Sequence, residues 1–161
     1  MKGKKVCWKT AQEIFKSKKF DVIKQGISSH DIYQGHIGDC YFLCSLSAIA
    51  EYPERIRRLL LTKKKNTKGI YAVAVCYCGV WKKVHLDSYF PLMDGKELFG
   101  AHSDQAELWV LLLEKAYAKM FSGYWNIGHG GSGYRAMKDM TSAPAERFTF
   151  EKFKKTKSGI N

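Results

Sequence analysis

Residues 40–51, CYFLCSLSAIAE, constrain the fold more than any other segment of the chain. Apolar side chains occupy nearly every side of the helix that this segment would form, and a helix that is apolar almost all round is buried on several sides. The chain has 161 residues, enough for one domain with a substantial core. We therefore expect a single domain over residues 1–161, with its packed core at about residues 8–145.

The segments around this helix predict a mixed architecture. Pro53 ends the helix, and residues 54–61 continue as a second helical piece. Alternating apolar residues in 70–78 and 81–86 predict two strands joined by a tight turn. The order of helix, hairpin and helix indicates the α+β class, mainly helical with a small antiparallel sheet.

The second half of the core is expected to contain a long amphipathic helix. Apolar residues recur at helical spacing up to about Phe121, and Asp104 is suited to cap the start of this helix. Asp94-Gly95 indicates a turn before the helix. Residues 128–133, GHGGSG, form a glycine-rich loop after it, and residues 146–161 are a basic C-terminal segment.

Composition limits the function classes. No apolar run is long enough to span a membrane, and the lysine-rich N-terminus lacks the apolar core of a secretory signal. Five cysteines without a C-x-x-C spacing favour free thiols in a reducing, intracellular setting. The net charge of +12 fits solvated basic loops, or alternatively a surface for nucleic acid or anionic lipid. Because no aromatic-basic RNA signature accompanies the charge, we expect no specific nucleic-acid partner.

Cys40 is the candidate nucleophile, because it stands where a glycine-bearing loop enters the apolar helix. Backbone N–H groups in a first helical turn stabilise a thiolate. Gln34, six residues earlier, could fold back so that its amide and the Cys40 N–H form a two-donor oxyanion hole. The alternative is a buried structural cysteine and an ordinary loop glutamine. We expect Cys44, one turn further, to be a buried core thiol.

Several separated motifs resemble those of the calpain family. Residues 34–43, QGHIGDCYFL, resemble the calpain nucleophile segment Q-G-x-x-G-D-C-W-x-L, and papain keeps the same offset between Gln and Cys. Residues 107–119, ELWVLLLEKAYAK, resemble the helix E-F-W-x-x-L-L-E-K-A-Y-A-K. Residues 8–14 and 86–92 resemble W-x-R-P-x-E-I and V-D-D-x-L-P. The resemblance extends from about residue 8 to about residue 145.

The resemblance implies a papain-like cysteine protease fold, of which this chain is the nucleophile-bearing lobe. The implied activity is calcium-dependent endopeptidase chemistry on polypeptide substrates, through an acyl-enzyme on Cys40. Gly130 and Gly131 correspond to the calpain S-G-G stretch that lines the substrate cleft. A second protease lobe is the implied partner, and residues 146–161 are either a basic tail or the start of that lobe.

The calpain catalytic His and Asn motifs, G-H-A-Y and N-P-W-G, do not occur in the chain. The five histidines lie in other contexts, and His129 in the glycine-rich loop is the nearest candidate by motif. A general base must reach the thiol by hydrogen bond, and that loop lines the nucleophile's own side of the cleft in the family. The alternative function is therefore an inactive, truncated or pseudo-protease lobe that binds calcium or a partner.

The resemblance also implies a calcium site. The family's two carboxylates map to Asp31 and Glu107, and its two carbonyls map to Lys24 and Gly26. Oxygen ligands of this kind suit Ca²⁺. Alternatively, Asp31 caps a local turn and Glu107 balances a helix dipole. Ser29 replaces the family arginine that links calcium binding to lobe closure, which affects the calcium switch rather than the site.

Overall fold

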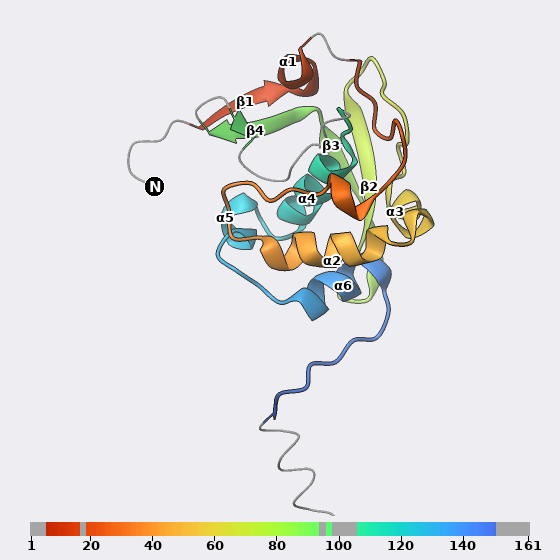
Figure 1. The fold of residues 1–161 in the computed structure, drawn as a ribbon, viewed down its shortest axis with the longest axis vertical. Helices are drawn as coiled ribbons and strands as arrows, with labels where there is room; N and C mark the ends of the chain where they lie inside the picture. The colour runs from red at the N-terminus through yellow and green to blue at the C-terminus, as the bar shows by residue number, and fades with distance from the viewer. Residues whose placement is uncertain (1–5, 17–18, 94–95, 98–105, 151–161) are drawn as a thin grey trace, which may run out of the picture.

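The computed structural model describes residues 6–16, 19–93, 96–97 and 106–150 (Figure 1). The described elements mix helices with short antiparallel strands, which confirms the α+β class. In chain order they are β1 (Val6–Thr10), α1 (Ala11–Phe15), the 3-10 turn η1 (Ser29–Asp31), α2 (Cys40–Ala50), α3 (Pro53–Leu59), β2 (Ile70–Tyr77), β3 (Val80–Asp87), β4 (Tyr89–Met93), β5 (Lys96–Glu97), α4 (Trp109–Met120), α5 (Tyr124–Ile127) and α6 (Gly133–Thr141).

Helix α2 crosses the middle of the fold, with α6 along one side of it and α3 at its end (Figure 1). Phe42 and Leu46 are fully buried, and burying each such side chain contributes roughly 1.5–3 kcal/mol. The expected burial is incomplete, because Cys40, Cys44 and Ala48 are exposed. The prediction that Cys44 is buried is wrong: residues four apart share one helix face, so the face that exposes Cys40 also exposes Cys44.

Helix α4 carries the other large part of the core. Tyr117 stacks on Phe42 of α2 with ring centroids 4.5 Å apart, which joins the two helices directly. The helix begins at Trp109, later than the sequence indicates. Ala106 has a left-handed φ of 57°, and the Leu108 and Trp109 amides donate to the carbonyls of Asp21 and Val22. Asp104 and Asp94-Gly95 lie outside the described residues.

The strands in the described residues form two antiparallel sheets, where the sequence indicates one. β2 and β3 pair over their full lengths, with Tyr77 opposite Val80. The turn between them is the expected one, since Cys78 and Gly79 have φ values of 52° and 80°, the positive angles that a tight hairpin requires. The second sheet has the order β1-β4-β5, and its pairing of residues far apart in sequence was not predicted.

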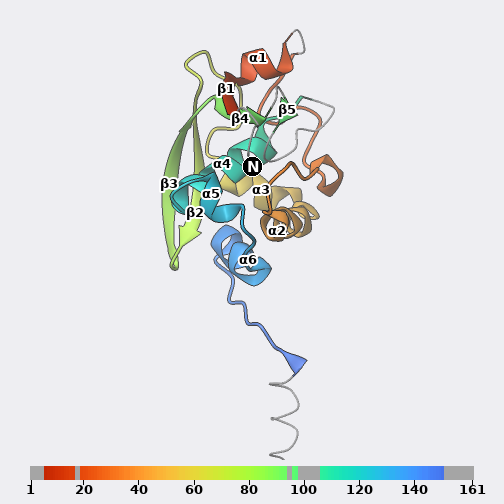
Figure 2. The ribbon, with the colours of Figure 1, turned by 90° about the vertical axis from the view of Figure 1, so that its left-hand side faces the viewer.

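The C-terminal part of the described chain forms α6 and then an extended segment. α6 packs on α2 and β2, and was not predicted from the sequence. After it, the chain runs away from the rest of the fold (Figures 1 and 2). Within the described ranges, no helix has the length and apolar character needed to cross a membrane.

Candidate active site

Cys40 is the first residue of α2, and it is exposed. The carbonyl of Asp39 closes the first turn by accepting from the amides of Phe42 and Leu43, at 2.8 Å and 3.1 Å. The sulfur therefore stands at the positive end of an eleven-residue helix, where backbone N–H groups favour an anion. A nucleophilic thiol requires such a position and exposure, and the assignment of Cys40 as the nucleophile stays a prediction.

The glycine-rich loop lies directly beside the nucleophile loop. The Gly38 amide donates to the Gly128 carbonyl at 2.9 Å, and the Gly130 amide donates to the Gly38 carbonyl at 3.0 Å. A Cβ on Gly38 would lie 2.7 Å from the Gly128 oxygen, so the approach requires glycine at this position. Two segments that are ninety residues apart in sequence are thus held together two residues before Cys40.

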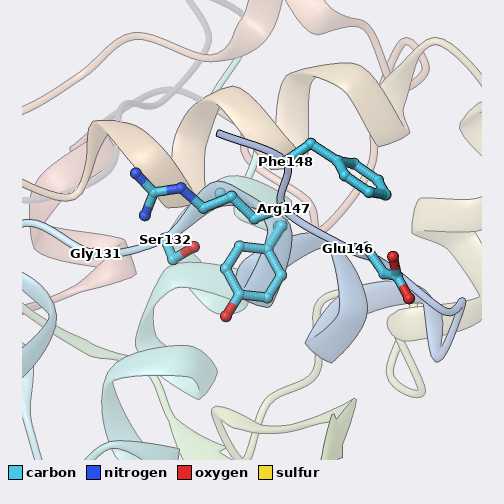
Figure 3. Close-up of a pocket in the computed structure, with 7 residues that line it drawn as sticks. Gly131, Ser132, Glu146, Arg147 and Phe148 are labelled. Carbon is cyan, nitrogen blue, oxygen red and sulfur yellow. The ribbon is translucent and has the colours of Figure 1, made fainter. Parts of the chain in front are cut away.

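Gly130 and Gly131 leave this junction exposed. A Cβ on Gly131 would clash with the ring of Tyr41, so the backbone at Gly131 lies directly against that aromatic ring. Gly131 also borders a hollow of about 450 Å³, whose other side is formed by Glu146, Arg147 and Phe148 (Figure 3). The loop presents accessible main chain next to the nucleophile, as a cleft that binds an extended peptide requires.

Gln34 is exposed in the loop before α2. Its Nε2 donates a hydrogen bond of 2.9 Å to the carbonyl of Ile37, so the side chain folds along the loop that leads to Cys40. An amide nitrogen carries two N–H groups, and this bond uses one of them. The direct approach of Gln34 to the Cys40 sulfur remains a prediction.

A profile of the calpain family cysteine proteases matches residues 1–160. The chain belongs to the calpain family. Over 137 residues it is 36% identical to the calpain-type cysteine protease ADL1 of Oryza sativa subsp. japonica, covering 84% of this chain and 6% of that protein. It is 32% identical to the calpain clp-4 of Caenorhabditis elegans and 30% identical to the calpain-1 catalytic subunit of Gallus gallus, covering 94% of this chain in each case.

The chain spans about a fifth of the animal calpains that it matches, 21% in both cases. Among its described histidines, His30 contacts the Ser28 hydroxyl, and His129 contacts the Trp125 carbonyl through Nδ1 at 2.7 Å. The His129 ring also lies 4.2 Å from the Trp125 ring. The backbone of His129 pairs with Gly38, so His129 lies beside the nucleophile loop. The resemblance to calpains likewise puts the glycine-rich loop on the nucleophile's side of the cleft.

Glu107 and Asp31 both accept hydrogen bonds from the backbone of residues 24–28, despite their separation in sequence. Glu107 is buried, and its Oε1 accepts from the amides of Lys24 and Gln25 at 2.6 Å and 2.7 Å. The Asp31 Oδ2 accepts from the Ser28 amide at 3.0 Å. Burial raises the pKa of Asp31, and the charge of Glu107 acts in the same direction.

The oxygen groups in this region have the chemistry of cation ligands. Two carboxylates that repel each other flank the 24–26 loop, which contains the Lys24 and Gly26 carbonyls, and oxygen ligands of this kind suit Ca²⁺. The local role anticipated for Asp31 is also present, because its side chain accepts from the backbone of Ser28, the N-cap of η1. No cluster of three or more His, Cys, Asp or Glu side chains that could hold a metal occurs among the described residues. A site here would therefore depend on backbone oxygens.

Two buried carboxyl side chains, one of them on the residue that precedes Cys40, were not predicted from the sequence. Asp39 and Glu114 are both 0% exposed. The available signal was the position of Glu114, which follows Leu111–Leu113 and falls four residues after Val110 on the buried face of α4. A charged residue on such a face calls for a partner, but the sequence does not indicate which one.

Proposed function

We propose that this calpain-family chain is the nucleophile-bearing lobe of a papain-like, calcium-dependent cysteine endopeptidase. The observation that supports this proposal most strongly is the exposed Cys40 at the start of α2, beside a loop with accessible main chain. In this role the Cys40 sulfur attacks the scissile carbonyl carbon of a polypeptide and forms an acyl-enzyme.

The oxyanion of the tetrahedral intermediate would be held by two donors. One is the Cys40 N–H at the start of α2, and the other is the Nε2 N–H of Gln34 that does not bind Ile37. Gly130 and Gly131 would bind the substrate main chain, because their positions leave peptide groups uncovered by side chains. Tyr41, against Gly131, would form an aromatic wall below that strand of substrate.

The missing component is an imidazole on the opposite wall. A peptide bond breaks only when its leaving amine receives a proton, and backbone N–H groups at a helix start do not supply one. A second lobe of the calpain type would provide this histidine. The competing proposal is that the chain acts as an inactive lobe that binds calcium or a protein partner, which the lack of the family's His and Asn motifs supports.

Calcium would bind between Asp31, Glu107 and the carbonyls of Lys24 and Gly26. The bound ion would neutralise the two carboxylates and thereby hold the loop before η1 against Glu107. Both carboxylates already bind the backbone of this region, so the residues are arranged for such a role without a large rearrangement.

The test is hydrolysis of a peptide amide by the purified chain, with and without calcium, compared with Cys40→Ala. We expect both proteins to cleave no faster than a small thiol. Addition of a separately produced calpain second lobe should then give cleavage by the wild type alone. If the mixture stays inactive although the lobes bind each other, the inactive-module proposal is favoured.

A further inference from the structure

Asp39 and Glu114 form a buried pair of carboxyls directly behind the nucleophile. Asp39 immediately precedes Cys40, and Glu114 lies in the middle of α4. Both residues are 0% exposed. Neither oxygen of the Asp39 carboxyl accepts a hydrogen bond from a described donor, and the Glu114 carboxyl is the neighbouring side chain that acts on the pKa of Asp39 as a hydrogen-bond partner. The pair therefore links the start of α2 to the central core helix.

Two ionised carboxylates cannot remain together in such an environment. Removing one charge from water is costly, and a second like charge beside it adds repulsion. One retained proton resolves both problems, because the protonated carboxyl then donates its O–H to the other. In agreement with this, burial raises the pKa of Asp39. The two acids then titrate as one unit.

The titratable groups around Asp39 and Glu114 do not favour loss of the proton that the two carboxyls share. Tyr124 of α5 is a titratable group that both carboxyls affect, and its pKa is raised by burial first and then by the charges of Glu114, Asp87 and Asp39. Tyr41 on α2 is affected by Asp39 in the same direction. The neighbouring cation Lys115 binds Asp87 at 2.6 Å.

Asp39 also departs from the usual role of its position. An aspartate that precedes a helix normally accepts hydrogen bonds from the first-turn amides through its side chain. Here Asp39 makes no side-chain cap, and its carboxyl is buried instead. The Asp39 side chain therefore leaves the Cys40 and Tyr41 N–H groups for the Cys40 sulfur and for a substrate oxyanion, whereas the Phe42 amide donates to the Asp39 carbonyl.

We propose that Asp39 and Glu114 share a single proton, and that Glu114 thereby keeps the Asp39 carboxylate away from the first turn of α2 and positions Cys40. This inference rests on the proposed role of Cys40 as the nucleophile. Glu114 is a positioning residue, since it acts through Asp39. Without a donor at position 114, the Asp39 carboxylate would turn to the first-turn amides and place a negative charge beside the sulfur.

The first test is the rate of Cys40 alkylation by iodoacetamide at pH 7, with Cys44 as the internal reference. Chymotrypsin cleaves between the two cysteines, so mass spectrometry quantifies each one. Glu114→Gln, whose amide can still donate to Asp39, should react within about twofold of the wild type. Glu114→Leu should react about five- to tenfold more slowly at Cys40, as expected for a charge at a helix start, with Cys44 unchanged. Adding Asp39→Asn to Glu114→Leu should restore the rate.

The second test is stability against pH, by urea unfolding of the full chain between pH 4 and 9. A raised folded-state pKa means that the folded protein holds the shared proton more tightly than the unfolded chain. The stabilisation is therefore present below the unfolded value and is lost as pH rises through the folded value. The wild type should lose more stability over this range than Glu114→Gln, which keeps the hydrogen bond and cannot lose this proton.

The outcomes distinguish the assignment of Cys40 as the nucleophile from the positioning role of Glu114. If Cys40 reacts no faster than Cys44 in the wild type, the nucleophile assignment fails. If Cys40 is the faster thiol but Glu114→Leu leaves its rate unchanged, or Asp39→Asn does not restore that rate, only the positioning role is overturned. Should Glu114→Leu fail to fold, parallel pH profiles for the wild type and Glu114→Gln would overturn the shared proton by themselves.

Discussion

The amide of Gly38 donates to the carbonyl of Gly128 at 2.9 Å, and this contact joins the nucleophile loop to the glycine-rich loop. A methyl group at position 38 would lie 2.7 Å from the same oxygen, well inside van der Waals contact. The two loops can therefore keep this spacing only with glycine at position 38. Because Cys40 follows two residues later, the contact also sets one boundary of the candidate cleft.

Gly38→Ala should lower the free energy of unfolding by about 1–3 kcal/mol, as overpacking against backbone typically does. Urea unfolding measures the effect. The matched control is Gly133→Ala, because a Cβ there would make only ordinary contacts, the nearest at 3.6 Å, and alanine favours a helix. Equal stability of Gly38→Ala and the wild type would show that the loops can separate without cost.

Gln34 should accelerate acylation of Cys40 by an activated ester. A peptide p-nitrophenyl ester releases a stable phenolate, so its leaving group needs no proton and the oxyanion donors can be tested without a general base. Gln34→Ala should slow this acylation at least about tenfold, a cautious value for one oxyanion donor. Alkylation by iodoacetamide forms no oxyanion, so it should be unaffected. An unchanged ester rate would remove Gln34 from the oxyanion hole.

Calcium binding should depend on Asp31 and Glu107. Isothermal titration calorimetry of the wild type should show one saturable site, and Asp31→Ala should weaken it at least about tenfold, since each charged oxygen ligand contributes strongly. Glu51→Gln removes an exposed acid at the far end of α2 and should bind like the wild type. Identical isotherms for wild type and Asp31→Ala would reject the site, and equal weakening in Glu51→Gln would indicate general charge attraction.

Asp139 and Asp87 should give opposite dependences of stability on pH. Burial raises the pKa of Asp139, so its contribution is full below the unfolded value and is lost as pH rises through the folded one. Burial also acts upward on the pKa of Asp87, but the hydrogen bond from Lys115 and further contacts leave it lowered overall. The Asp87 contribution is therefore present at neutral pH and is lost on acidification.

The measurement is the urea midpoint of wild type, Asp139→Asn and Asp87→Asn between pH 3 and 7. Relative to wild type, Asp139→Asn should become more stable as pH rises, whereas Asp87→Asn should become less stable. The same sign of slope for both variants would contradict this assignment.

The parts of the fold that depend on local periodicity were predictable from sequence. The helix at residues 40–50 and the hairpin around Cys78 each follow from patterns within a few residues. The pairing of β1 with β4 and the position of α6 depend on contacts between distant segments, which no local pattern encodes. Cys44 shows a different limit, because a cysteine is small enough to occupy either a buried or an exposed side of an apolar helix.

The candidate site also combines residues that a local pattern identifies with residues that depend on contacts between distant segments. Cys40 was identifiable because the glycines before it and the apolar helix after it lie in one short segment. The burial of both Asp39 and Glu114 was not identifiable, because it depends on how α4 is rotated against the start of α2. The carboxylates at positions 31 and 107 could be named only through the family resemblance, and the structure shows that Glu107 binds the 24–25 amides.

The most direct test of Cys40 as the nucleophile is the reaction of the purified chain with at least one equivalent of a peptide p-nitrophenyl ester. The wild type should release a burst of about one phenolate per chain, carry an acyl group that mass spectrometry locates on Cys40, and turn over little afterwards because no base activates water. Cys40→Ala should show no burst. An acyl group on Cys44 or another cysteine, or a wild type that behaves like Cys40→Ala, would contradict the assignment of Cys40 as the nucleophile.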